Sequence, residues 1–226
     1  MILKSDWFSC DYFRQNIDIE VVKKLSHYSL MTIVSVLTVP VSQIILRNMI
    51  IETKGLQAAG IWQGMMRVSD GYLLLMTTAL ATYYLPKLAS LHTNRDLRTE
   101  IIQGYKLIIP TVFVSCLLIY FLRYFIITIL YTPDFIAMSD LFFYQLLGDF
   151  FKMGSWILAY LMLAKSMTKV FIITEIIFSL LYVLLGYVCV NYFGLKGISI
   201  AFALNYFLYW VTMLFVFKKL LIKNNE

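Results

Sequence analysis

The chain has 226 residues, of which 61% are hydrophobic and 14% are charged, with a formal net charge of +6. Soluble domains carry about 45–50% apolar and roughly 25% charged residues, so a mean hydropathy of +0.78 excludes an ordinary water-soluble protein. The basic residues stand in short connections between apolar runs, which is typical of membrane-protein loops. The positive charge therefore does not indicate a nucleic-acid partner.

Six apolar runs are long enough to cross a bilayer as helices, because a spanning helix needs roughly 20 mostly apolar residues. In chain order, the predicted spans are 28–50, 60–85, 107–130, 141–163, 170–190 and 197–217. Runs of this length favour helices over barrel strands, which alternate over about 10 residues. The sequence therefore predicts an all-α membrane protein, a bundle of about six transmembrane helices, with residues 28–226 as one transmembrane lobe.

Residues 1–27 interleave aromatic and aliphatic side chains with charged ones and contain no predicted span. This mixture is typical of a segment that lies at the membrane surface. We expect a cytoplasmic or interfacial linker here. The segment lacks the basic start and apolar core of a signal peptide, so no cleaved leader is expected.

The basic residues are distributed unequally between the two sides of the predicted bundle. The N-terminal segment, the C-terminal tail and the connections after the second and fourth spans hold 13 of them, whereas the other set holds four. Basic loops remain in the cytoplasm. We therefore expect both termini in the cytoplasm, which requires an even number of spans.

Two acid–base pairs lie inside the predicted spans, where a charge is costly. Arg67 and Asp70 are three residues apart in the second span, and Asp149 and Lys152 are three apart in the fourth. Residues at this spacing share a helix face. Each pair could neutralise itself and hold helices in register, but two pairs in separate spans favour a hydrophilic lumen.

Two other charged residues have open interpretations. Glu175 lies near the cytoplasmic end of the fifth span, where we expect it to meet Lys165 or Lys169. Arg47 ends the first span, and its long side chain could reach either the lipid head groups or a lumen.

The motifs of several enzyme classes are absent from the sequence. It contains no P-loop, HExxH or GxSxG motif, and Cys10, Cys116 and Cys189 are too far apart for a CxxC-type site. We therefore predict no catalytic residue, no metal site and no cofactor, and we expect that the chain is not an enzyme.

Several stretches of the sequence carry a family resemblance. They are LSHYSLMTIVSVLTVPVSQIILR, GIWQGMMRVSDGYL, YYLPKLASL with RDLRTEI, MSDLFFYQLLGDFFKMGSWILAYLMLAKS and the TE of FIITEI. They cover most of residues 25–180, and their most specific parts are GIWQG…SD and QLLGD..K. These stretches resemble the Wzx-type polysaccharide flippases, the O-antigen translocases and lipid III flippases of the multidrug/oligosaccharidyl-lipid/polysaccharide exporter superfamily.

The resemblance implies the C-terminal lobe of a two-lobed, MATE-like transporter. Such flippases move an undecaprenyl-diphosphate-linked oligosaccharide, an O-antigen or enterobacterial common antigen repeat unit, across the bacterial inner membrane. The implied partners are membrane lipid, this lipid-linked glycan, an N-terminal lobe or another half, and the polysaccharide polymerase machinery. A chain holding one lobe would be a fragment, a split gene product or a half that needs a partner.

The resemblance also implies roles for individual residues. Arg47, Arg67 and Lys152 become candidates for a cationic cavity that binds the substrate, and Asp70 and Asp149 become their acidic partners and candidates for ion coupling. Aromatic residues in or near the spans are expected to anchor or pack the helices, and the sequence does not show which of them could stack on sugar rings. They include Tyr83, Tyr84, Trp156, Tyr192 and Trp210.

Three alternatives remain open. A small-solute or multidrug exporter would share the fold, although Arg67 and Lys152 favour an anionic substrate over a cationic drug. The chain could also be a structural half that transports nothing. A membrane glycosyltransferase or polymerase usually needs a sizeable periplasmic loop, and the predicted periplasmic loops are short.

Overall fold

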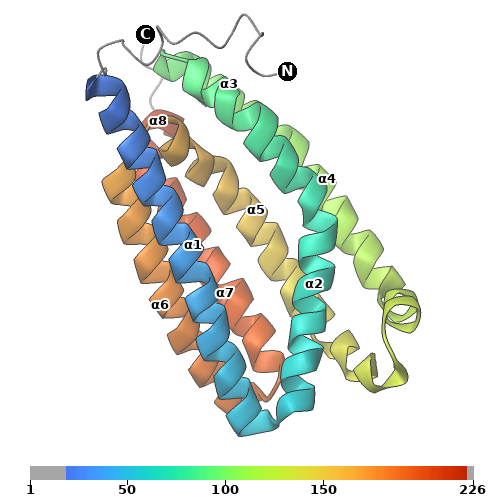
Figure 1. The fold of residues 1–226 in the computed structure, drawn as a ribbon. Helices are drawn as coiled ribbons and strands as arrows, with labels where there is room; N and C mark the ends of the chain where they lie inside the picture. The colour runs from blue at the N-terminus through green and yellow to red at the C-terminus, as the bar shows by residue number, and fades with distance from the viewer. Residues whose placement is uncertain (1–18, 223–226) are drawn as a thin grey trace, which may run out of the picture.

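The computed structural model describes residues 19–222, and this part of the chain is a bundle of long helices without a strand (Figure 1). The elements are α1 (Ile19–Lys54), α2 (Leu56–Ala79), a π-helical turn (Leu80–Tyr84), α3 (Leu85–Ser90), α4 (Asn94–Leu130), a 3-10 segment (Pro133–Asp140), α5 (Phe142–Ala164), α6 (Thr168–Phe193), α7 (Lys196–Val216) and α8 (Lys218–Ile222). The predicted all-α membrane bundle is confirmed.

Within the described residues, five helices are long and apolar enough to cross a membrane. They correspond to the first predicted span and the last four. The segments are Leu25–Lys54, Asn94–Leu130, Phe142–Ala164, Thr168–Phe193 and Lys196–Val216.

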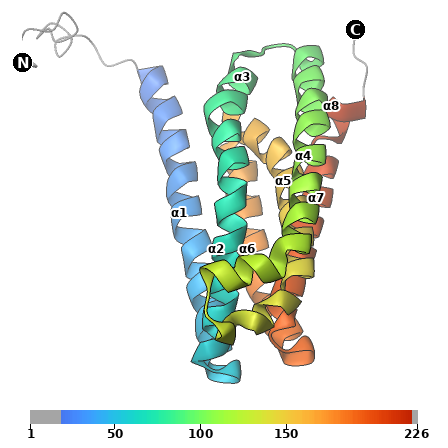
Figure 2. The ribbon, with the colours of Figure 1, turned by 90° about the vertical axis from the view of Figure 1, so that its right-hand side faces the viewer.

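The second predicted span is a helix of sufficient length, at 24 residues, but it is not apolar enough to be counted with these five. Gln63, Arg67 and Asp70 lower the hydropathy of α2. Even so, α2, the π-helical turn and α3 follow one another without a break from Leu56 to Ser90, and they run alongside the other helices in both views (Figures 1 and 2). Helix α2 therefore lies in the bundle beside the apolar helices, although it contains polar and charged residues.

The predicted linker at 1–27 falls on two parts of the chain. Residues 1–18 lie outside the described residues, and residues 19–27 form the first turns of α1. The division between linker and lobe therefore stays a prediction.

Two of the tight connections between neighbouring helices contain glycine. Gly55, between α1 and α2, has φ +90°, and Gly194, between α6 and α7, has φ +64°. Residues with a Cβ atom rarely adopt this backbone conformation, whereas glycine does so readily. These turns reverse the chain, so that α2 runs back along α1 and α7 runs back along α6 (Figure 1).

Helix α5 packs closely against α7 because small residues lie at their contact. A Cβ atom on Gly148 would lie 2.3 Å from Cδ1 of Phe202, and a Cβ atom on Gly154 would lie 2.8 Å from Cε2 of Trp210. Membrane helices associate mainly through such van der Waals packing, since lipid gives no hydrophobic drive between them. The α5–α7 contact is thus a tightly fitted part of the bundle.

Helix α6 makes a second close contact, with α1. A Cβ atom on Gly186 would lie 2.3 Å from Cδ2 of Leu46. The hydroxyls of Ser42 and Ser179 are hydrogen-bonded across the same contact, and the Ser179 hydroxyl also donates to the carbonyl of Thr38 at 3.2 Å. Helices α1, α6, α7 and α5 therefore form a connected series that encloses the site described next.

Candidate functional site

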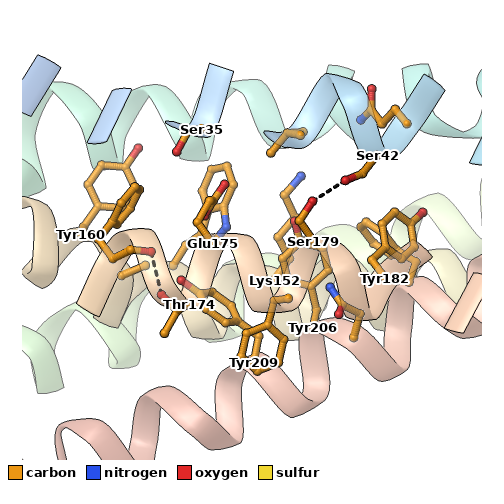
Figure 3. A pocket seen from close by; sticks show the side chains of 18 of the residues that line it. Ser35, Ser42, Lys152, Tyr160, Thr174, Glu175, Ser179, Tyr182, Tyr206 and Tyr209 are labelled. Atoms are coloured by element: carbon orange, nitrogen blue, oxygen red, sulfur yellow. Dashed lines mark hydrogen bonds between the residues drawn. The ribbon is translucent and has the colours of Figure 1, made fainter. Parts of the chain in front are cut away.

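A cavity of about 510 Å³ lies among α1, α2, α5, α6 and α7 (Figure 3). We call it the pocket. Its charged lining residues are Asp70 of α2, Lys152 of α5 and Glu175 of α6. Its volume is within the range of about 300–1,000 Å³ that is usual for small-ligand sites.

Lys152 is held among aromatic rings. Its ammonium nitrogen lies 5.0 Å from the ring centroid of Trp156 and 5.8 Å from that of Tyr206. A cation within about 6 Å of a ring centroid is attracted by the negative face of the ring. Lys152 is half-buried and makes no ion pair with Asp149, so this predicted pair does not neutralise itself by direct contact.

Glu175 lies at the pocket, not at an interfacial salt bridge. It is half-buried on α6, and Figure 3 shows it across from Ser35 of α1. No ion pair joins it to either lysine that the sequence suggested; of these, Lys165 donates instead to the carbonyl of Leu91. Glu175 is therefore a pocket residue that sequence reasoning assigned elsewhere.

Aromatic rings form much of the pocket wall, and they hold one another in place. The rings of Phe178 and Tyr209 meet edge to face with centroids 4.9 Å apart, and those of Phe202 and Tyr206 do so at 4.8 Å. Edge-to-face contacts of this kind are favourable beyond the area that they bury. The aromatic lining residues are Trp156, Tyr160, Phe171, Phe178, Tyr182, Phe202, Tyr206 and Tyr209.

Asp149 is fully buried and belongs to a separate cluster of polar residues that does not line the pocket. Its carboxylate accepts hydrogen bonds from the hydroxyls of Ser69 and Tyr72, the latter at 2.8 Å. Gln145 donates to the Ser69 hydroxyl at 3.3 Å and accepts from Ser199 at 3.3 Å. These five residues, the Asp149 cluster, link α5 to α2 and α7.

The other oxygen of Asp149, Oδ1, is buried and has no hydrogen-bond partner among the described residues. An acceptor left unsatisfied in a buried site is costly. The Asp149 cluster is therefore polar and well connected, but it is not fully satisfied.

The two predicted arginines do not line the pocket. Arg47 and Arg67 are exposed, and Arg67 makes no ion pair with Asp70. At 1.5 Å of rise per residue, Arg47 and Arg67 lie roughly 12 and 18 Å along their helices from the turn at Gly55. Of the five predicted site residues, the structure brings Asp70 and Lys152 to the pocket and places the other three elsewhere.

The sequence analysis did not predict that Glu175 and the tyrosines line one pocket, although their spacing along the helices indicates it. Glu175, Ser179 and Tyr182 are spaced i, i+4, i+7 along α6, which places them on one helix face. Phe202 and Tyr209 share a face of α7 in the same way. A search for polar and aromatic residues at this spacing within the spans would have found both faces.

No group of three or more His, Cys, Asp or Glu side chains in residues 19–222 is placed to hold a metal ion. The polar groups that the pocket offers to a ligand are carboxylates, hydroxyls, two amides and one ammonium. These polar groups can bind a polar organic molecule by hydrogen bonds, and the aromatic lining residues can contact it with their ring faces.

The fold and the pocket define a multi-pass membrane protein with a polar, aromatic-lined cavity. Comparison with known proteins adds that the chain is 30% identical over 210 residues to the proteins named lipid III flippase of Escherichia coli (strain K12) and Shigella flexneri. The alignment covers 93% of this chain and 50% of each relative, so the chain spans about half the length of the curated relatives that it matches. The resemblance to Wzx-type flippases is confirmed. No family model matches the chain, and no solved structure matches it significantly.

Proposed function

We propose that this chain forms one lobe of a flippase that moves an undecaprenyl-diphosphate-linked oligosaccharide across the bacterial inner membrane. The observation that carries the proposal is the similarity to lipid III flippases along 93% of the chain. Since the aligned part is half of each relative, a second lobe would complete the transporter. The proposed protein is a transporter, which makes and breaks no covalent bond. Its two termini lie in the cytoplasm.

The exposed polar face of α2 supports a water-filled cavity. Gln63, Arg67 and Asp70 are exposed and follow one another at i, i+4, i+7, before the surface becomes apolar at Leu74 and Leu75. Charged side chains in hydrocarbon are costly and usually face a bundle interior or water. This face is therefore suited to an opposing lobe or an aqueous path, through which a diphosphate could pass.

A second candidate is an exporter of small cationic solutes with the same fold. The specific observation in its favour is that two carboxylates, Asp70 and Glu175, share the pocket with one ammonium, that of Lys152. The exposed Arg67 on the neighbouring face favours an anionic substrate instead.

Genetic complementation tests the proposed function. The chain would be expressed in an E. coli strain that lacks its lipid III flippase, alone and together with the N-terminal half of that flippase. We expect surface common antigen, measured with antibody, to return only when both halves are present. Absence of rescue despite confirmed membrane insertion of both halves would contradict the proposal, and resistance to cationic drugs would favour the exporter.

Substitutions of Arg67 sharpen this test. Arg67→Ala should reduce rescue about tenfold or more, because one charge-assisted contact with a phosphate contributes more than about 1.4 kcal/mol. Lys169→Ala removes an exposed cation at the start of α6, away from the pocket lining, and serves as the matched control. Equal rescue by both variants would show that Arg67 does not contact the substrate.

A further inference from the structure

We infer that the pocket binds a sugar ring of the transported glycan, and that the diphosphate binds outside it. The inference rests on the proposed function and assigns one part of the substrate to this site. It changes the role of Lys152 from a diphosphate ligand to a sugar ligand.

The charge of the pocket does not suit a diphosphate. Asp70 and Glu175 outnumber the single cation, Lys152. A diphosphate carries several negative charges, and like charges in a site of low dielectric repel strongly. The ammonium of Lys152 also already faces the rings of Trp156 and Tyr206. A neutral, hydroxyl-rich ligand fits this balance better.

The aromatic walls suit a sugar ring. One face of a pyranose presents C–H bonds, which pack against the negative face of an aromatic ring. Trp156 is half-buried at the pocket, with Tyr160 next to it at a centroid distance of 6.3 Å. Because neighbouring rings fix one another, little side-chain freedom would be lost when a flat ligand binds.

The polar lining supplies partners for hydroxyl groups. The Glu175 carboxylate can accept hydrogen bonds from hydroxyls, and the Lys152 ammonium can donate to them. The Tyr182 hydroxyl and the Asn205 amide oxygen are buried with no hydrogen-bond partner among the described residues. Both residues line the pocket, so a ligand that enters it could satisfy groups that the protein leaves unpaired.

The positions of the arginines agree with a separate place for the diphosphate. Arg47 and Arg67 are exposed and lie outside the pocket lining. A guanidinium group matches phosphate oxygens in a bidentate manner, which an ammonium group does not. The arginines on α1 and α2 would therefore contact the diphosphate while the sugar occupies the pocket.

Native mass spectrometry of the purified chain can separate the two parts of the substrate. The probes are lipid III, which carries a glycan, and undecaprenyl diphosphate, which carries none. We expect Trp156→Ala to weaken lipid III binding about tenfold and to leave undecaprenyl diphosphate binding unchanged, because only the glycan loses a stacking surface. Trp156→Phe should restore most of the lipid III affinity, since it keeps an aromatic face.

The variant set contains its own controls. Tyr187→Ala removes an exposed aromatic ring from α6 outside the pocket lining and should bind both probes as the original chain does. Glu175→Ala should weaken lipid III alone, so the test does not depend on whether Trp156→Ala folds. Arg67→Ala should weaken both probes, because both carry the diphosphate.

Two results would overturn the inference in distinguishable ways. If the original chain binds both lipids but Trp156→Ala and Glu175→Ala change the two affinities equally, or change neither, the pocket does not hold the sugar and the proposed function stands. If the original chain binds neither lipid and complementation also fails, the proposed function fails and the inference fails with it.

Discussion

Asp149 and Glu175 are both acidic residues inside the bundle, but their surroundings differ. Asp149 is fully buried and accepts hydrogen bonds from Ser69 and Tyr72 of α2. Glu175 is half-buried and borders open volume. A carboxylate whose donors come from a neighbouring helix holds that helix in place, whereas one that borders a cavity is available to a ligand. This difference favours a structural role for the Asp149 cluster and agrees with the binding role that we propose for the pocket.

Removing the Asp149 carboxylate should give the largest loss of stability. Asp149→Ala leaves the hydroxyls of Ser69 and Tyr72 without their acceptor, which should lower the free energy of unfolding by about 2–3 kcal/mol. Unfolding in mixed detergent micelles, followed by circular dichroism, measures the loss. Asp149→Asn keeps an acceptor oxygen and should lose less than half as much. If the Asp149→Ala variant unfolded as the original chain does, Asp149 would have no structural role. Its predicted role in ion coupling would then be favoured.

A methyl group at Gly148 should be nearly as damaging. Gly148→Ala places Cβ 2.3 Å from Cδ1 of Phe202 and 3.1 Å from Cα of Ala203, and overpacking of this kind costs about 1–3 kcal/mol. The same unfolding titration would report it. Gly71→Ala is the matched control because nothing lies within 4 Å of its Cβ position. If both variants were equally stable, the α5–α7 contact would be looser than the structure shows.

In contrast to these two changes, substitutions in the pocket should have a large effect on transport and a small effect on stability. Lys152→Ala should cost about 1 kcal/mol of stability, because Lys152 is half-buried and a cation–π contact contributes about 0.5–1 kcal/mol at exposed sites and about 2 kcal/mol when desolvated. In the two-half complementation assay, the same variant should reduce surface antigen at least severalfold. Lys152→Arg keeps the charge over the rings and should recover part of the activity. A stability loss as large as that of Asp149→Ala would place Lys152 with the structural residues.

The hydroxyl pair between α1 and α6 should have the smallest effect. Ser179→Ala removes a donor to the Thr38 carbonyl and the hydrogen bond with Ser42. Hydrogen bonds between membrane helices contribute about 0.6 kcal/mol on average, so a loss near that value is expected in the unfolding titration. Ser90→Ala, at an exposed position at the end of α3, provides the baseline. A loss above about 2 kcal/mol would contradict this expectation. It would show that the serine hydrogen bonds hold α1 against α6 in addition to the close packing at Gly186.

The charged residues show where prediction from the sequence reached its limit. The i, i+3 spacing correctly put Asp149 and Lys152 near one face of α5, but it did not reveal that the first contacts α2 and the second faces the pocket. Residues three apart on a helix differ by about 60° in direction. On a helix surrounded by neighbours, that angle is enough to give them different partners.

Glu175 shows the same limit from the other direction. Its nearness to the end of a span suggested an interfacial salt bridge with Lys165 or Lys169, but the neighbouring helices place it at the pocket, which Lys152 also lines. Position along one helix gives the approximate depth of a residue in the membrane. It does not give the direction in which the residue faces a partner helix.

The sequence by itself determined that the chain is a helical membrane bundle and which flippases it resembles. It also placed the last three spans to within a few residues, whereas α1 and α4 begin at Ile19 and Asn94, well before the predicted starts at 28 and 107. Span positions are local properties, because each depends on the length and apolarity of one continuous run. Only the tertiary structure decided which charges meet donors and which border a cavity. That outcome depends on how five helices, far apart in the sequence, turn their faces toward one another, and no single run of residues contains this information.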